Sequence, residues 1–126
     1  MPSITLTELA GDYGIARLSA DAANPGWADG DGLFTVSRTD DELSVLCLAN
    51  RIPDSVKRDL GWTAFKFEGP FAFHEHGILL SVVAPISGAG IGVFVISTFD
   101  TDYLLVKTET ARTVRGLLSA AGHTLR

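Results

Sequence analysis

Disulfide-forming cysteine is what this chain most clearly lacks, because its 126 residues include a single cysteine, Cys47. A lone thiol is typical of a reducing compartment, so we expect a cytoplasmic protein. Long apolar runs are missing as well, since none approaches the ~18 residues that a membrane-spanning helix needs. The opening segment, Met1–Leu9, is short and interrupted by polar residues, unlike an export leader. We therefore expect a soluble protein without a membrane partner.

Excess positive charge is also absent. Ten lysines and arginines stand against fifteen aspartates and glutamates, which gives a formal net charge of −5. The basic residues are scattered, and Lys57-Arg58 is the only adjacent pair. Nucleic-acid surfaces need clustered positive charge, so we expect no nucleic-acid partner. The composition, 46% hydrophobic and 20% charged, predicts a folded domain rather than a disordered chain.

Signatures of catalysis and of metal or cofactor binding are missing too. The chain has no Gly-x-Ser-x-Gly turn and no cysteine with an obvious base, although a triad that only folding assembles leaves no such signature. Gly88–Gly92 reads G-x-G-x-G, but no Lys-Ser/Thr follows it, and the order of elements is reversed for a dinucleotide site. His74-Glu75-His76 has zinc-ligand residue types without the second cluster that zinc needs. We expect no enzyme, no metal site and no cofactor.

The pattern that is present is clearest after Gly61. In Trp62–Glu68, aromatic and charged side chains alternate with a period of two, which predicts a strand covered on one face. In His76–Ser87, apolar residues recur at helical spacing, which predicts a helix. Pro85 removes a hydrogen bond from that helix, so we expect a kink or an end near Ala84.

Four further elements complete the second half of the chain. They are a strand apolar on both faces, a short strand, a helix and a last strand, at Ile91–Ser97, Tyr103–Lys107, Thr108–Ala121 and His123–Arg126. Thr108 suits a helix cap and Gly122 a helix end. The resulting βαββαβ order is the ferredoxin-like unit, in which two helices cover one face of an antiparallel sheet. The sequence therefore predicts an α+β fold.

The first half repeats this scheme weakly. It contains four strand-like runs, at Ile4–Leu9, Tyr13–Leu18, Leu33–Thr39 and Leu43–Leu48. We expect a loop at Ser19–Gly32, where the second half has its first helix, and a short helix at Pro53–Leu60. Since no low-complexity linker separates the halves, we expect a degenerate half at residues 1–60 and a complete half at residues 61–126, packed as one compact body.

The doubly apolar strand Ile91–Ser97 needs a neighbour on its second side. In the βαββαβ order this strand lies at the edge of the sheet, where exposed apolar backbone promotes aggregation. We expect Leu33–Thr39 of the first half to pair with it. A homodimer through the second halves is the alternative.

The best candidate site lies within Ile91–Thr108, where a short polar connection joins two strands. This connection holds Thr98, Phe99, Asp100 and Asp102, so it places carboxylates and hydroxyls where the strands meet. The plainer alternative is that the two aspartates shape and solubilise a turn, since aspartate favours turns by bonding to its own backbone.

Three segments resemble a known family: Glu42–Leu48, Gly61–Pro70 and, above all, Ile91–Lys107. They are similar to small bacterial proteins built of two tandem ACT domains, of the ACT subtype that also occurs in the eukaryotic cytosolic arginine sensors. The resemblance spans nearly the whole chain, and its most specific part is the Ser-Thr-Phe-x-x-Asp connection at Ser97–Asp102. It implies two tandem ferredoxin-like ACT units, the first of them degenerate, with antiparallel sheets and helices on one face.

The resemblance also implies regulation by a small molecule, typically an amino acid, bound at an interface between ACT units. Carried over by position, the ligand pocket falls on His76, Gly77, Ile78, Thr98, Phe99 and Asp102. A helix start presents unpaired N–H groups that suit an α-carboxylate, and Asp102 suits an α-ammonium. Arginine specificity does not carry over, because in that family several units contact the ligand's side chain and this chain is shorter. The alternative is an interaction or scaffold protein with a vestigial pocket.

Overall fold

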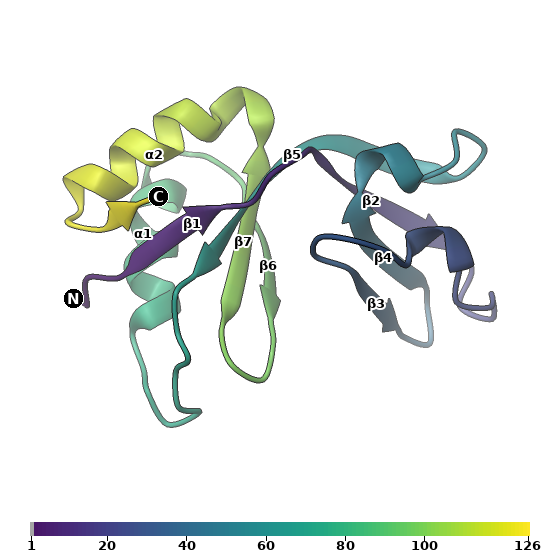
Figure 1. The fold of residues 1–126 in the computed structure, drawn as a ribbon, viewed down its shortest axis with the longest axis horizontal. Helices are drawn as coiled ribbons and strands as arrows, with labels where there is room; N and C mark the ends of the chain where they lie inside the picture. Colours follow the sequence, from purple (N-terminus) through teal and green to yellow (C-terminus); the bar gives the residue numbers. More distant parts are fainter. Residues whose placement is uncertain (1) are drawn as a thin grey trace. The chain divides into compact units, whose positions relative to one another are not determined.

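The structure, a computed structural model, describes residues 2–126 and divides the chain into two compact units (Figure 1). We call Ala10–Trp62 the minor unit. The major unit combines Thr63–Arg126 with the N-terminal segment that ends at Leu9. Each unit has a buried hydrophobic cluster of its own.

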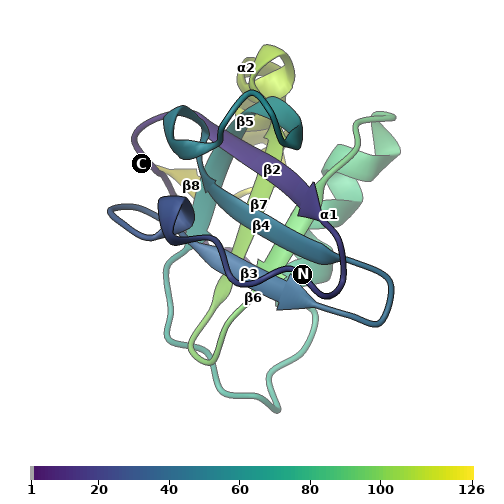
Figure 2. The ribbon, with the colours of Figure 1, turned by 90° about the vertical axis from the view of Figure 1, so that its right-hand side faces the viewer.

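The minor unit is an antiparallel sheet in the order β3-β4-β2-β5, and Figure 2 shows β3, β4 and β2 lying side by side. Its strands are β2, β3, β4 and the first part of β5, at Tyr13–Leu18, Thr35–Arg38, Leu43–Leu48 and Lys57–Phe67. Two 3-10 turns accompany them, η1 at Gly26–Ala28 and η2 at Ala49–Arg51. Residues Ala16, Val45 and Cys47 contribute to the buried cluster. The predicted loop at Ser19–Gly32 is confirmed, since η1 is its only regular structure.

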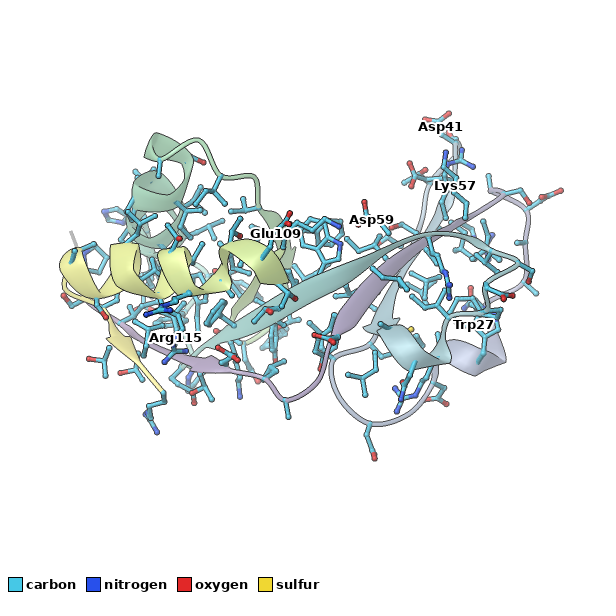
Figure 3. All side chains as sticks on the ribbon, turned by 90° about the horizontal axis from the view of Figure 1, so that it is seen from above. Trp27, Asp41, Lys57, Asp59, Glu109 and Arg115 are labelled. Atoms are coloured by element: carbon cyan, nitrogen blue, oxygen red, sulfur yellow. The ribbon has the colours of Figure 1, made fainter. Side chains whose placement is uncertain are left out.

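Polar contacts fasten the connections of the minor unit. Arg17 Nη2 donates to the carbonyl of Asp41 over 3.0 Å, at the end of the sheet where Figure 3 labels Asp41 and Lys57. Arg38 of β3 donates to carbonyl oxygens of the preceding loop, including that of Ala22 at 2.7 Å. Basic side chains on the strands therefore hold the loop and the hairpin turn in place.

The predicted helix at Pro53–Leu60 is wrong, because β5 begins at Lys57 and pairs with β2. The antiparallel ladder satisfies the backbone groups that a helix would have satisfied internally. Tyr13 pairs with Trp62 and Gly14 pairs with Leu60, so Gly61 is an extra residue in β5, a β-bulge. Its φ of 82° lies in the left-handed region, which glycine adopts without a steric penalty.

The major unit has a sheet in the order β6-β7-β5-β1-β8 and two helices. Its elements are β1, the rest of β5, α1, β6, β7, α2 and β8, at Thr5–Glu8, Lys57–Phe67, Ile78–Gly88, Phe94–Ser97, Asp102–Lys107, Ala111–Ala120 and Thr124–Leu125. A 3-10 turn, η3 at Thr108–Thr110, precedes α2. From β5 to β8 these elements follow the predicted βαββαβ order, so the α+β, ferredoxin-like fold is confirmed.

The strand predicted at Ile4–Leu9 forms as β1, at Thr5–Glu8, but it enters the major unit rather than the first half of the chain. β1 lies between β5, to which it is antiparallel, and β8, to which it is parallel. The Thr124 N–H donates to Ile4 O at 2.9 Å, and the Arg126 N–H donates to Leu6 O at 2.8 Å. In the structure β1 therefore lies in the major unit, although it falls within residues 1–60 of the predicted division.

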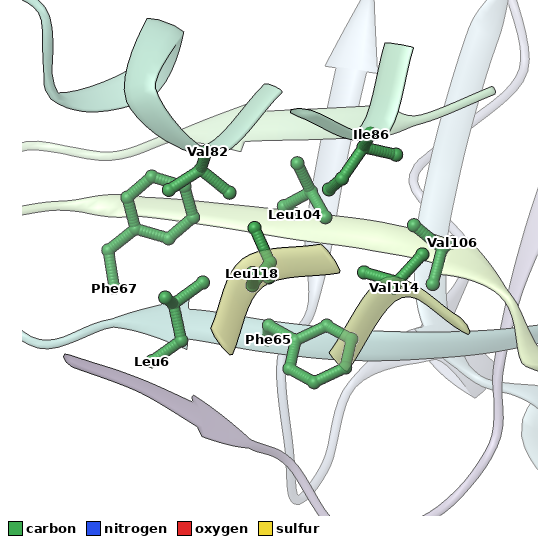
Figure 4. Packing of buried hydrophobic residues seen from close by; sticks show 9 residues of the cluster. All are labelled: Leu6, Phe65, Phe67, Val82, Ile86, Leu104, Val106, Val114 and Leu118. Carbon is green, nitrogen blue, oxygen red and sulfur yellow. The ribbon is translucent and has the colours of Figure 1, made fainter. Parts of the chain in front are cut away.

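The core of the major unit lies between its sheet and both helices (Figure 4). The buried members come from three strands and two helices: Leu6, Phe65, Phe67, Val82, Ile86, Leu104, Val106, Val114 and Leu118. Burying a side chain such as Phe65 stabilises the fold by about 1.5–3 kcal/mol. Phe65 and Phe67 face the core and Lys66 lies between them in sequence, so the alternation predicted for this strand is confirmed.

The sequence predicted a kink or an end of helix α1 near Ala84. The end is not formed, because α1 continues through Pro85 to Gly88. Proline has no N–H, so the carbonyl four residues earlier, on Ser81, lacks its helical donor. The ring of His123 lies 2.9 Å from that carbonyl through Nε2. A side chain from outside the helix thus satisfies the group that Pro85 leaves open.

Strand β6 pairs with β7 alone, and β3 pairs with β4 alone, within the part of the chain that the structure describes. The pairing predicted between Ile91–Ser97 and Leu33–Thr39 is therefore not formed. Among residues 2–126, no helix has the length and apolar character needed to cross a membrane.

Candidate functional site

A pocket of about 320 Å³ opens on the major unit, where two connections and a helix start meet. Its walls come from the β5–α1 loop, from the first turn of α1 and from the β6–β7 turn. Figures 1 and 2 both show these two connections at the same end of the major unit. The pocket therefore joins segments that are separate in the sequence.

The β6–β7 turn is shaped by Thr98. Its N–H and its hydroxyl both donate to the carbonyl of Thr101, at 2.8 and 3.0 Å. Thr101 is buried, and its own hydroxyl donates to Phe67 O over 2.6 Å. The Thr98 hydroxyl hydrogen is thus used within the turn, so Thr98 has a structural role in this wall of the pocket.

Asp102 is oriented by the residue opposite it in the β6–β7 ladder, Ser97. The Ser97 hydroxyl donates to Asp102 Oδ1 over 2.5 Å. A carboxylate held by one neighbouring donor still has lone pairs for a further donor. Asp102 is therefore a preoriented acceptor at the pocket wall.

The opposite wall is the N-terminal end of α1. Gly77 precedes the helix in a left-handed conformation, with φ of 80°, and provides no side-chain cap. The first bond of the helix runs from the Ser81 N–H to Gly77 O at 3.0 Å. The first N–H groups of a helix lack internal partners and carry a partial positive charge, which suits an anionic group.

Negative charge dominates the pocket walls. Glu75, Asp100 and Asp102 line the pocket, and no described lysine, arginine or histidine does so. Glu75 is held in the loop, because the Ala72 N–H donates to its Oε2 over 2.7 Å. This distribution favours a cationic group of a ligand near the carboxylates and leaves only backbone donors for an anionic group.

The structure brings together most of the residues predicted from the sequence. Gly77, Ile78, Thr98, Phe99 and Asp102 all line the 320 Å³ pocket. His76 does not line it but faces a neighbouring pocket of about 450 Å³, beside Pro2–Ile4 and His74. His76 is separated from the 320 Å³ pocket because the chain turns at Gly77 before the helix starts.

Sequence reasoning missed Phe73, Glu75 and Ser97, which also line the pocket. Ser97 had a detectable signal, since a hairpin between the two strands places it opposite Asp102. Phe73 and Glu75 had none, because their positions depend on how an irregular loop folds back. The loop is fastened there by a bond from the Phe71 N–H to Asp100 O at 2.8 Å.

Other classes of site are weakly supported. Among the described residues, no group of three or more His, Cys, Asp or Glu side chains is placed to hold a metal ion. Cys47 is buried. Burial raises the pKa of its thiol above the ordinary value of 9.0, and the nearby charge of Arg51 only partly offsets this. A thiol that stays protonated is a poor nucleophile.

Family comparisons match each part of the chain separately. A family model for the ACT domain matches residues 57–120. A second family model, which describes an N-terminal domain, matches residues 11–55. A comparison with curated proteins gives no match. The two matched ranges meet close to the start of β5.

Solved structures of similar fold include one relative of high identity. A protein from Agobacterium tumefaciens is 56% identical, with 100% of this chain and 94% of that chain covered and a TM-score of 0.96. A protein of unknown function from Vibrio cholerae, described as a possible transport protein, is 17% identical, with 94% and 90% covered and a TM-score of 0.74. Aspartate kinase from Clostridium acetobutylicum, described as an allosteric enzyme, is 11% identical, with 94% and 35% covered and a TM-score of 0.68.

Proposed function

Because the chain belongs to the ACT-domain family, we propose that it is a regulatory protein that senses a small molecule and binds an amino acid in the 320 Å³ pocket of its major unit. The proposal includes a cytoplasmic location, in agreement with the lone buried thiol, and no catalytic activity of the chain itself. The observation that carries it is the pairing of a preoriented carboxylate with a helix start in one pocket.

The two ends of an amino acid fit the two walls. The α-ammonium donates to the Asp102 carboxylate, which the Ser97 hydroxyl keeps in place. The α-carboxylate meets the first amides of α1, where the helix dipole and the unpaired N–H groups favour it. Hydrogen bonds to charged groups contribute about 1.5–3 kcal/mol each, so two such contacts supply a usable share of micromolar affinity.

Regulation requires that the ligand bind one conformer better than another. The pocket lies between the β5–α1 loop and the β6–β7 turn. A ligand that contacts both segments would favour the conformer in which the loop and the turn lie close to each other. The proposal also includes a homodimer formed along β6, which has β7 as its one partner strand in the described part of the chain.

A thermal-shift screen with the individual amino acids tests the proposal. A true ligand at ~100 times its dissociation constant stabilises the folded protein by ~2.7 kcal/mol and raises its melting temperature. No shift with any amino acid would favour the alternative, an interaction or scaffold protein with a vestigial pocket.

Asp102→Asn is the matched variant for this screen. Asparagine still accepts the Ser97 hydroxyl hydrogen, so the turn is retained, but the charge that holds the ammonium is lost. We expect about 10- to 100-fold weaker binding, which corresponds to the loss of one charged hydrogen bond. Asp100→Asn is the control, because Asp100 contributes its backbone carbonyl to the loop, and should weaken binding far less. Equal losses in both variants, or an unfolded Asp102→Asn protein, would favour the turn-shaping role instead.

A further inference from the structure

The most exposed large apolar side chains of the described residues gather at the mouth of this pocket. Phe73 is 77% exposed, Phe99 is 79% exposed and Leu80 is 59% exposed. They come from the β5–α1 loop, the β6–β7 turn and the first turn of α1, and all line the pocket. We call these three residues the aromatic patch. Single exposed apolar residues are ordinary on protein surfaces, but a cluster of them marks an interaction site.

The aromatic patch is preorganised. The rings of Phe73 and Phe99 meet edge to face, with centroids 4.9 Å apart and an interplanar angle of 77°. Hydrogen bonds hold the β5–α1 loop and the β6–β7 turn in place close to these rings. The Phe71 N–H donates to Asp100 O, and the Ala72 N–H donates to Glu75 Oε2. Rigid aromatic side chains that need no ordering on contact are the residues that dominate binding energy in interfaces.

The charge around the aromatic patch selects its occupant. Glu75, Asp100 and Asp102 border the same pocket, and no described basic side chain lines it. An anionic membrane surface is therefore repelled. A second copy related by a two-fold axis would bring the same carboxylates against each other. The only other large apolar side chain exposed in the described residues is Phe34, at 37%, so this chain presents no second apolar surface to complement the first.

We propose that the aromatic patch docks a cationic, amphipathic segment of another protein, in which lysines or arginines flank apolar residues. Its apolar side chains cover Phe73, Phe99 and Leu80, and its cations meet the carboxylates of the rim and the faces of the two rings. The proposal depends on the surface alone and holds whether or not an amino acid binds below it.

If the proposed function also holds, the amino acid and the docked segment are coupled. Phe73 and Phe99 line the pocket in which the amino acid is placed, so ligand and docked segment contact the same two connections. Each would then change the affinity of the other by the same factor. The regulated target would sense the amino acid through the aromatic patch.

The test is fluorescence anisotropy with a labelled amphipathic helical peptide made of lysine and leucine, compared with the same peptide in which glutamate replaces lysine. We expect the lysine peptide to bind and the glutamate peptide not to bind. The double variant Phe73→Ser, Phe99→Ser should bind the lysine peptide at least about tenfold more weakly, because it lacks both rings. Phe34→Ser is the matched control and should bind like the native protein.

Several results would overturn the proposal: no binding of the lysine peptide, equal binding of the glutamate peptide, or an equal loss in Phe34→Ser. Sedimentation of the protein with phosphatidylserine vesicles would assign the aromatic patch to membranes instead. A lower mass of the double variant in light scattering would assign it to self-association. Circular dichroism establishes that each variant is folded. The peptide assay contains no amino acid, so its failure and a failure of the amino-acid screen are separate results.

Discussion

His123 and Pro85 depend on each other, although they lie far apart in the sequence. A carbonyl oxygen only accepts, so His123 Nε2 must donate to Ser81 O. The other ring nitrogen, Nδ1, is then the acceptor for the Ile4 N–H, at 3.2 Å. His123 therefore connects α1 and the segment before β1 to the start of β8, with both of its ring nitrogens bonded.

Replacing His123 with alanine leaves two backbone groups without partners, and each such group costs about 1–3 kcal/mol when buried. We expect the free energy of unfolding in urea to fall by about 2–5 kcal/mol. His76→Ala, at an exposed position, should change it by less than about 0.5 kcal/mol.

A double-mutant cycle isolates the link between the two residues. Pro85→Ala restores an N–H that reaches Ser81 O, so in the His123→Ala background it should recover part of the lost stability. If the effects of the two substitutions on stability simply add, His123 does not replace the donor that Pro85 lacks at Ser81 O.

The raised pKa of Cys47 predicts how the stability of the folded protein depends on pH. Because burial raises the pKa of its thiol, the unfolded chain ionises at a lower pH than the folded chain. The folded state keeps its full stability below pH 9.0 and loses stability as the pH rises from there toward the raised pKa. Native protein should react slowly with a thiol reagent at about pH 8, and denatured protein rapidly. Fast labelling of the native protein would show that Cys47 is accessible.

The sequence identified residues of the candidate site in two ways. Asp102 was singled out by the polar connection between two strand-like runs, and it begins β7. Gly77, which precedes α1, was placed only by the resemblance to the ACT family. Glu75 and Phe73 lie in an irregular loop whose position is set by contacts with the β6–β7 turn, such as the bond from the Phe71 N–H to Asp100 O. Nothing in the chain's periodicity encodes that contact.

At the scale of elements, the alternation of apolar and polar side chains predicted well where strands lie, but it did not predict which strands pair. The bounds of β2 and β4 agree with the predicted ones, since side chains of period two define them locally. The insertion of β1 between β5 and β8 was missed, because pairing depends on residues at opposite ends of the chain. The stretch from Lys57 was taken for a helix because its neighbour β2 lies far away in sequence.

The position of β6 at the edge of the sheet predicts self-association through that strand. We expect light scattering at micromolar concentration to give the mass of a dimer, because an apolar strand at the edge of a sheet readily adds a further strand. Ile96→Lys places a charge on this strand and should give the mass of a monomer. Ser37→Lys on β3, the other strand with a single partner, is the control and should remain dimeric. A monomeric native protein would contradict the dimer.

At the scale of the whole molecule, each unit matches a family model of its own. The ACT-domain match at residues 57–120 covers most of the unit that holds the pocket and the aromatic patch. Composition and charge argued against a membrane-spanning helix and a nucleic-acid surface but carried no information on a ligand. That part of the account depends on where folding brings Asp102 and the start of α1, which only the structure provides.

The most direct test of the central claim is a nuclear magnetic resonance titration of uniformly ¹⁵N-labelled protein with the amino acids. The account predicts that one amino acid shifts, in a saturable manner, the backbone amides at the start of α1, from Ile78 to Leu80, together with those of Ser97–Asp102. Amides of the minor unit, Ala10–Trp62, should move far less. Saturable shifts confined to the minor unit, or no shifts with any amino acid, would contradict it.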